Sequence, residues 1–338
     1  MNRTMNRIAV AATLGGVLLA GMTTAVAQEA VRIGTSSVGS NFYRLAVGAG
    51  EVINQKGAIN TSVQAVGGSA ATVRGLDAGK IEFGIANAFA GVTGYEGTFS
   101  FKKSGKMKVR LAVQGGANHR GIAVRNGSGI KSVKDLEGKT IIGKRRPLPE
   151  LELITNAMLK VYGVDPGKVK IVGTTNTGQA LKLLTVGSVD AAVLPYGPKA
   201  ANIQKPMSDG VFHFLDVSKE KRDAALKHLP GLIFGATQTP EWFDDQKGST
   251  EIFAMNTLFL THPEVSDDTV YKVVKSIMEN NKLFVSYHHQ AVDWTPENTL
   301  ANVQLPFHEG AVRYFKEAGA WTPALEKRQK ELLAGARN

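Results

Sequence analysis

Short apolar runs alternate with longer segments of helical periodicity along most of the chain. The apolar runs are typical of strands and cover residues 31–34, 61–65, 83–86, 109–113, 121–124, 139–143, 169–172, 191–194 and 252–260. Amphipathic segments predict helices over residues 41–55, 70–78, 150–162, 177–186 and 267–286, followed by a helical tail from residue 306. Strands that alternate with helices indicate crossover connections and mostly parallel sheets. The pattern therefore predicts an α/β fold.

The alternation starts twice, and this predicts two lobes. A loop over residues 114–120 separates the last two strands of the first set, and a new set starts at residue 139. We expect the chain to cross between lobes near residues 115–120 and again near residues 232–237. Lobe I then comprises residues 28–117 and 235–338, and lobe II, inserted into it, comprises residues 118–234. Two crossings make a hinge, and ligands commonly bind in the cleft between such lobes.

The first 27 residues have the features of a secretory signal peptide. Arg3 and Arg7 precede an uncharged run over residues 8–20, and Ala25-Val26-Ala27 fits the small-x-small cleavage pattern. The run is shorter than the ~20 residues that span a bilayer, so cleavage is expected instead of a membrane anchor. We expect a mature chain that starts near Gln28 and is exported to a bacterial periplasm.

Composition and missing motifs exclude several classes of chemistry. The net charge is +11, but the basic residues are scattered, which is a poor pattern for binding nucleic acid. The absence of cysteine excludes thiol nucleophiles, Cys-ligated zinc and thioether-linked cofactors. The chain has no P-loop, no Gly-x-Gly-x-x-Gly after a strand, no nucleophile elbow and no His-x-x-x-His pair. We therefore expect no enzymatic activity, no cofactor and no metal.

Two loops rich in glycine and serine are suited to an anion. Residues 35–40, which include Ser37, Gly39 and Ser40, and residues 67–69 each follow a strand and precede a helix. Small residues allow a ligand to approach the backbone, and a helix N-terminus favours negative charge. The hydroxyl groups of Ser40 and Ser69 can add donors. The alternative is that both loops are ordinary caps and turns.

A basic turn over residues 144–150 occupies the equivalent position in the second lobe. It follows a strand and precedes a helix, so it should face the same cleft. A guanidinium group binds a carboxylate through two parallel hydrogen bonds. We expect Arg145 or Arg146 to hold an acidic group of the ligand, and the alternative is a solvated basic turn.

A set of stretches spread over the chain has a recognisable pattern. They are residues 33–43, 67–69, 77–87, 135–139 and 162–164, and the most specific ones are residues 305–311 and 314–319. Together they resemble the TAXI-type solute receptors of tripartite ATP-independent periplasmic (TRAP) transporters. The resemblance spans essentially the whole mature chain. It implies a monomeric two-lobe periplasmic binding protein of the type II kind, which closes over a small organic anion. The family favours carboxylates such as glutamate, glutamine or 2-oxoglutarate, and passes them to a TRAP-type membrane permease.

The resemblance also suggests which residues contact the ligand. The first-lobe positions that carry over are Ser37, Gly39, Phe42, Tyr43, Ser69 and Asn87, where the family more often has Gln. With Ser40, Gly68, Arg145, Arg146 and Tyr196 they form the predicted ligand-binding set. The second lobe departs from the family pattern: residues 145–152 replace a Ser-Gly-Thr-Glu run, Val193-Leu194 replace an aromatic pair, and residues 238–240 lack a Gly-Thr-Tyr turn. These changes remove the residues that identify the ligand in the family, so the resemblance does not specify the substrate of this protein.

Three other functions stay open. One is an exported sensor module that passes its ligand to a signalling protein. Another is a receptor for an ATP-driven importer of sulfonates or similar anions, against which the run at residues 306–311 argues. The third is an enzyme with the fold of porphobilinogen-type deaminases, which need a cysteine for their cofactor. A fold shared with an enzyme is not by itself evidence of catalytic activity.

Overall fold

The computed structural model describes residues 29–335, and the predicted signal peptide lies outside these residues. The strands are β1 (Ala30–Thr35), β2 (Asn60–Ala65), β3 (Phe83–Asn87), β4 (Arg110–Arg125), β5 (Thr140–Lys144), β6 (Lys170–Gly173), β7 (Ala191–Tyr196), β8 (Phe212–Phe214), β9 (Phe234–Gln238) and β10 (Thr250–Thr261). The α-helices are α1 (Asn41–Lys56), α2 (Ser69–Asp77), α3 (Ala88–Glu96), α4 (Glu150–Tyr162), α5 (Thr177–Thr185), α6 (Ala201–Ser208), α7 (Lys219–Leu226), α8 (Asp267–Glu279), α9 (Asn281–Tyr287), α10 (Pro296–Leu300), α11 (Glu309–Glu317) and α12 (Pro323–Leu333). Short 3₁₀ turns are η1 (Phe99–Phe101), η2 (Val133–Leu136), η3 (Pro166–Lys168), η4 (Pro240–Trp242) and η5 (His289–Asp293).

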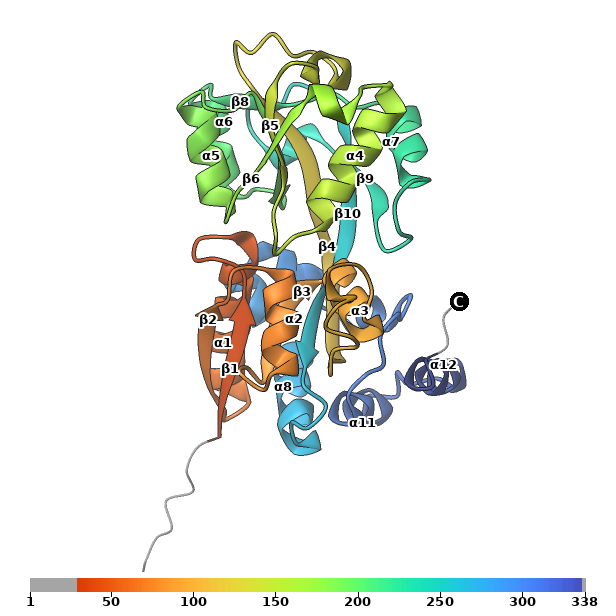
Figure 1. Ribbon diagram of the computed structural model, residues 1–338. Helices are drawn as coiled ribbons and strands as arrows, with labels where there is room; N and C mark the ends of the chain where they lie inside the picture. Colours follow the sequence, from red (N-terminus) through yellow and green to blue (C-terminus); the bar gives the residue numbers. More distant parts are fainter. Residues whose placement is uncertain (1–28, 336–338) are drawn as a thin grey trace, which may run out of the picture.

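The elements form two lobes connected by the long strands β4 and β10 (Figure 1). The strand order is β2-β1-β3-β10-β4-β7-β5-β6, with β8 paired to β4 and β9 to β10. Strands β1, β2 and β3 are parallel in one lobe, β5, β6 and β7 are parallel in the other, and β4 and β10 are antiparallel to each other. The predicted α/β class with one lobe inserted in the other is confirmed.

Strand β4 differs from the prediction of two strands joined by a loop over residues 114–120. It is one continuous strand, with a bulge where Ala117 pairs with Asn256 but Gly115 pairs with the next residue of β10. A Cβ atom at Gly115 would lie 2.2 Å from the Trp294 side chain, and one at Gly116 would lie 2.1 Å from the Asp293 side chain. The glycine pair therefore allows η5 and the residue after it to pack closely on the strand, and does not form a turn.

The chain returns to the first lobe within β10. Phe243 and Ile252 belong to a hydrophobic cluster of the inserted lobe, whereas Leu258 and Phe259 belong to the core of the first lobe. Strand β9 pairs with the half of β10 that lies in the inserted lobe. The second crossing therefore lies within β10, later in the chain than residues 232–237, where the sequence pattern predicted it.

Most of the other predicted helices and strands agree closely with the observed ones, because local signals define them. Helix α4, for example, has Glu150 and Glu152 in its first turn, where the helix dipole favours negative charge. It ends at Gly163, whose φ of 71° lies in the left-handed region that glycine adopts without strain. The helix predicted over residues 267–286 is divided at Asn280 into α8 and α9. Helices α3, α6, α7 and α10 and strands β8 and β9 were not predicted.

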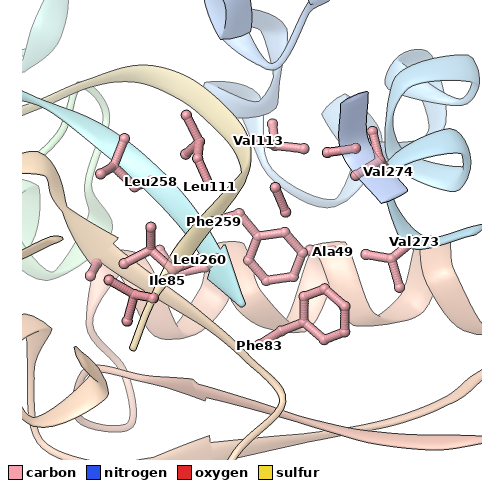
Figure 2. Close-up of a cluster of buried hydrophobic side chains, with 14 of the residues drawn as sticks. Ala49, Phe83, Ile85, Leu111, Val113, Leu258, Phe259, Leu260, Val273 and Val274 are labelled. Atoms are coloured by element: carbon pink, nitrogen blue, oxygen red, sulfur yellow. The ribbon is translucent and has the colours of Figure 1, made fainter. Parts of the chain in front are cut away.

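The core of the first lobe lies between its strands and helices α1 and α8 (Figure 2). The rings of Phe83 on β3 and Phe259 on β10 stack with centroids 5.3 Å apart. Ala49 of α1 and Val273 of α8 are fully buried in the same cluster. Because β3 and β10 are buried on both faces, their sequences are nearly continuous apolar runs, and such runs predict strands.

The C-terminal run at residues 305–311 has a structural role. The Leu111 amide donates to the Pro306 carbonyl and the His308 amide donates to the Leu111 carbonyl, both at 2.9 Å. The His308 side chain caps α11 by accepting from the Gly310 amide. A Cβ atom at Gly310 would lie 2.2 Å from the Asp267 carbonyl oxygen, so only glycine allows α11 to pack this closely on α8. The run fixes α11 to α8 and to strand β4.

Candidate functional site

A cavity of about 50 Å³ lies between the two lobes. Its lining residues are Ser36, Ser37, Ser40, Asn41, Phe42 and Gly67 from the first lobe, Asn118 and Arg120 from β4, and Arg145, Leu148, Thr177, Pro195, Tyr196 and Asn202 from the inserted lobe. Closure of the lobes thus brings together segments that are far apart in the sequence.

The strand order explains why these segments meet. Strands β1 and β2 are parallel neighbours, so the loops after both lie at the same edge of the sheet. Strands β5 and β7 are also parallel neighbours, and their carboxyl ends carry Arg145 and Tyr196. In open α/β sheets, ligands bind outside the carboxyl ends of the strands.

Arg145 is the lining cation with free hydrogen-bond donors. Its side chain is 6% exposed, and its Nη1 donates to Thr177 Oγ1 at 3.3 Å. Its Nε and Nη2 are buried and have no partner among the described residues. Burial, with the nearby positive charge of Arg120, lowers the pKa of Arg145 to about 10, so the group stays charged at neutral pH. The N–H bonds of Nε and Nη2 lie side by side, which is the geometry that binds two oxygens of one anion.

Arg146, the neighbouring residue, lies on the surface. Its side chain is exposed and it is not part of the cavity lining. Of the two arginines that the basic turn offers, only Arg145 lies in the site.

Arg120 is the second lining cation, and its charge is already compensated. Its Nη2 and Nε lie 2.6 and 3.2 Å from Glu150 Oε1, and both side chains are almost fully buried. Its Nη1 donates to Asn118 Oδ1 and to the His119 carbonyl. Asn87 Nδ2 of the first lobe also donates to Glu150 Oε1, at 2.9 Å. The cavity therefore contains one paired guanidinium group and one with free donors.

The predicted ligand-binding residues divide into two groups. Five of the predicted residues line the cavity: Ser37, Ser40, Phe42, Arg145 and Tyr196. The others are not part of the lining: Gly39, Tyr43, Gly68, Ser69, Asn87 and Arg146.

Gly67 lines the cavity, whereas Gly68, Ser69 and the following Ala70 contact Asn87 of the first lobe and the basic turn of the inserted lobe. Ser69 Oγ accepts from the Asn87 amide at 3.1 Å, and Asn87 in turn bonds to Glu150. The Ala70 amide donates to the Pro147 carbonyl at 3.2 Å, and a Cβ atom at Gly68 would lie 2.9 Å from Pro147. This loop packs against the basic turn and helps to hold the lobes together.

Tyr196 lines the cavity, but its hydroxyl group already has a hydrogen-bond partner and is not available to donate to a ligand. That hydroxyl donates to Gln238 Oε1, and the ring stacks on Phe214 with centroids 4.6 Å apart. Complete burial raises the pKa of Tyr196 well above its usual value, so the side chain is neutral.

Sequence reasoning missed several lining residues, namely Ser36, Asn41, Gly67, Asn118, Arg120, Leu148, Thr177, Pro195 and Asn202. Asn118 and Arg120 were missed because residues 114–120 were predicted as a loop. In a strand, residues two apart point to the same face, so a correct strand assignment would have paired them. Asn41 and Thr177 begin helices that were predicted, but no pattern indicates which residues of a first turn face the cleft.

Residues 29–335 contain neither a membrane-spanning helix nor a cluster of metal-ligating side chains. No helix there is long and apolar enough to cross a membrane. No group of three histidine, aspartate or glutamate side chains there has the arrangement to hold a metal ion.

Two α/β lobes, two connecting strands and a cavity of mixed polar and apolar lining at the lobe boundary define the architecture of two-lobe solute-binding proteins. The chain belongs to the NMT1-like family, which it matches over residues 33–319. It is also similar to the alkanesulfonate-binding protein SsuA from Xanthomonas axonopodis pv. citri bound to MOPS, at 13% identity and a TM-score of 0.48, over 89% of this chain and 82% of that one. An ancestral arginine-binding protein bound to arginine is similar at 18% identity and a TM-score of 0.48, over 78% of this chain and 97% of that one.

Proposed function

We propose that this protein is a periplasmic receptor that binds a small organic anion between its lobes and delivers it to a membrane transporter. The observation that carries the proposal is the buried guanidinium group of Arg145, which lines the cavity between the lobes and has two donors without a partner among the described residues. A buried charge without a partner destabilises a protein by several kcal/mol in typical cases, roughly 3–5 kcal/mol. A carboxylate or sulfonate group removes that penalty by accepting both hydrogen bonds.

Lobe closure couples binding to delivery. Arg145 and Thr177 belong to the inserted lobe, whereas Ser37, Ser40 and Phe42 belong to the first lobe. A ligand can contact both sets only when the lobes are together. Since a ligand shifts an equilibrium only through differential affinity, an anion held from both sides stabilises the closed form. A transporter can then distinguish the loaded receptor from the free one by its shape.

The resemblance to TAXI-type receptors favours a TRAP-type permease as the partner, and the N-terminal pattern favours export to the periplasm. A receptor for an ATP-driven importer of sulfonates is the second candidate. A sulfonate, like a carboxylate, presents two oxygens to the guanidinium edge of Arg145. The chemistry of the site is therefore compatible with either class of ligand. Binding is proposed instead of catalysis, because the lining combines hydroxyl, amide and guanidinium groups without an evident nucleophile and base pair.

Calorimetry with Arg145→Lys and Arg146→Lys tests the proposal. The probes are lactate, propionate, 2-oxoglutarate, glutamate, isethionate and the uncharged propionamide. We expect at least one anion to bind, and Arg145→Lys to weaken that binding about 10- to 100-fold, because a hydrogen bond to a charged group contributes roughly 1.5–3 kcal/mol. Arg146→Lys is the matched control at the same net charge and should bind like the wild type.

Equal affinity of the wild type and Arg145→Lys for every anion that binds would contradict the proposal. Binding of propionamide without binding of any anion would do the same. The partner is tested separately by uptake into vesicles that contain the cognate permease. Uptake driven by an ion gradient supports a TRAP-type partner, and a requirement for ATP supports the importer.

A further inference from the structure

The charges around the cavity restrict the ligand more than the proposed function does. We infer that the ligand is a short monoanion with a neutral hydrogen-bond donor, such as a small hydroxy acid, and that the site rejects α-amino acids and dianions. The inference rests on the proposed function, because it assumes that Arg145 holds the anionic group.

Charge balance excludes a second negative charge on the ligand. Two cations line the cavity, Arg120 and Arg145, and no acidic residue is among the lining residues that the structure describes. Glu150, just behind the lining, compensates Arg120 at 2.6 Å. One positive charge therefore remains to be neutralised, that of Arg145. A dianion would leave one buried negative charge without a partner, which is strongly unfavourable.

The same lining excludes an ammonium group. An α-amino acid carries its ammonium group close to its carboxylate, so the ammonium would lie near Arg145 in the cavity. A buried ammonium group needs an anionic partner that neutralises its charge, because a neutral amide oxygen accepts its hydrogen bond but leaves the charge uncompensated, and the described lining offers no carboxylate for it. The positive charge of Arg145 would also repel it.

Two unpartnered acceptors point to a neutral donor on the ligand. Asn41 Oδ1 of the first lobe and Asn202 Oδ1 of the inserted lobe are both buried without a hydrogen-bond partner. Asn41 Nδ2 donates to Gln290 Oε1, and this bond leaves the Asn41 oxygen available. Buried acceptors are normally satisfied. A hydroxyl group on the ligand satisfies either of them without adding charge.

The size of the cavity limits the length of the ligand. A water molecule needs roughly 10–15 Å³ of this kind of volume. The cavity of about 50 Å³ therefore has room for roughly three to five water molecules, which is on the scale of a two- or three-carbon hydroxy acid. Phe42, Leu148 and Pro195 provide apolar walls for its carbon atoms.

A calorimetric panel of size-matched probes tests each part of the inference. Lactate is compared with alanine, which replaces the hydroxyl by an ammonium, with propionate, which lacks the donor, and with malonate, which adds a charge. Isethionate and taurine form the equivalent pair for a sulfonate. We expect lactate or isethionate to bind, the corresponding amino compound and malonate to bind at least 100-fold more weakly, and propionate to bind at least tenfold more weakly.

The variant Asn202→Ala tests the role of the unpartnered acceptor. It should reduce the preference for lactate over propionate, or for isethionate over ethanesulfonate, while binding still depends on Arg145. Asn156→Ala, an exposed position on α4, is the control and should leave the preference unchanged.

The outcomes separate this inference from the proposed function. Tight binding of alanine, taurine or malonate that depends on Arg145 would overturn the inference and leave the proposed function intact. If Asn202→Ala prefers lactate over propionate as strongly as the wild type does, Asn202 Oδ1 does not accept a hydrogen bond from the ligand hydroxyl. Failure of every anion in the panel, amino acids and dianions included, would overturn both.

Discussion

Glu150→Gln removes one charge from an ion pair that lies at the junction of the two lobes. Glu150 is 0% exposed and its partner Arg120 is 2% exposed. Oε1 of Glu150 accepts from Nη2 of Arg120 at 2.6 Å, from Nε of Arg120 at 3.2 Å and from Nδ2 of Asn87 at 2.9 Å. Glutamine preserves the shape and one oxygen, but it leaves the Arg120 charge uncompensated inside the protein.

We expect this substitution to lower the free energy of unfolding by about 3–5 kcal/mol, the usual effect of breaking one side of a buried pair. The exposed pair of Glu137 and Lys168 is the matched control, with side chains 49% and 61% exposed. Glu137→Gln should lower the free energy of unfolding by less than about 1 kcal/mol, because solvent screens that pair. The difference between the two variants isolates the contribution of burial.

Urea unfolding, followed by circular dichroism and by tryptophan fluorescence, measures both variants. Coincident transitions from the two probes are required, because a two-lobe protein can unfold in more than one step. The double variant Arg120→Met/Glu150→Gln removes both charges and should be more stable than Glu150→Gln alone. The reasoning is refuted if Glu150→Gln and Glu137→Gln lose the same stability, or if the double variant is less stable than Glu150→Gln.

Two further predictions concern buried polar groups outside the cavity lining. Ser69→Ala should lower the free energy of unfolding by about 1–3 kcal/mol, because it leaves the buried Asn87 amide without an acceptor; denaturant unfolding checks this, and a loss below that range argues against the bond. Burial, with the charge of Arg120, lowers the pKa of His119 from 6.5 to about 3, so the unfolded chain binds a proton first as the pH falls. Stability from His119 is therefore complete above about pH 6.5 and decreases between pH 6.5 and 3, by at most about 1.4 kcal/mol per pH unit. His119→Gln should flatten the pH dependence of unfolding over this window, and an unchanged slope would contradict the assignment.

Arg145 shows how far the sequence specifies the site. The basic turn follows a strand and precedes a helix, and this order alone placed it at the cleft. Two adjacent arginines satisfied that argument equally well. Only the tertiary structure distinguishes them: Pro147 of the turn packs against the loop at residues 67–69, and in this arrangement Arg145 is buried whereas Arg146 is exposed.

Ser69 and Asn87 show the opposite case. Ser69 belongs to a loop with the composition of an anion site, and the resemblance placed both Ser69 and Asn87, the last residue of β3, in the ligand set. Their hydrogen-bonding groups are instead used between Ser69, Asn87 and Glu150. A serine at the start of a helix has one local chemistry, and whether it meets a ligand or a protein group depends on what the rest of the chain brings beside it.

The sequence by itself determined the local elements, because continuous apolar runs, helical periodicity and glycine at helix ends act over a few residues. It also determined that the elements form two α/β lobes. The tertiary structure decided that residues 110–125 form one strand across both lobes, since Gly115 pairs with β10 and accommodates Trp294 and Gly116 accommodates Asp293. It also decided the pairing of Arg120 with Glu150 and the free donors of Arg145. These features depend on contacts between residues distant in the sequence, and neither periodicity nor local composition encodes which of them will meet.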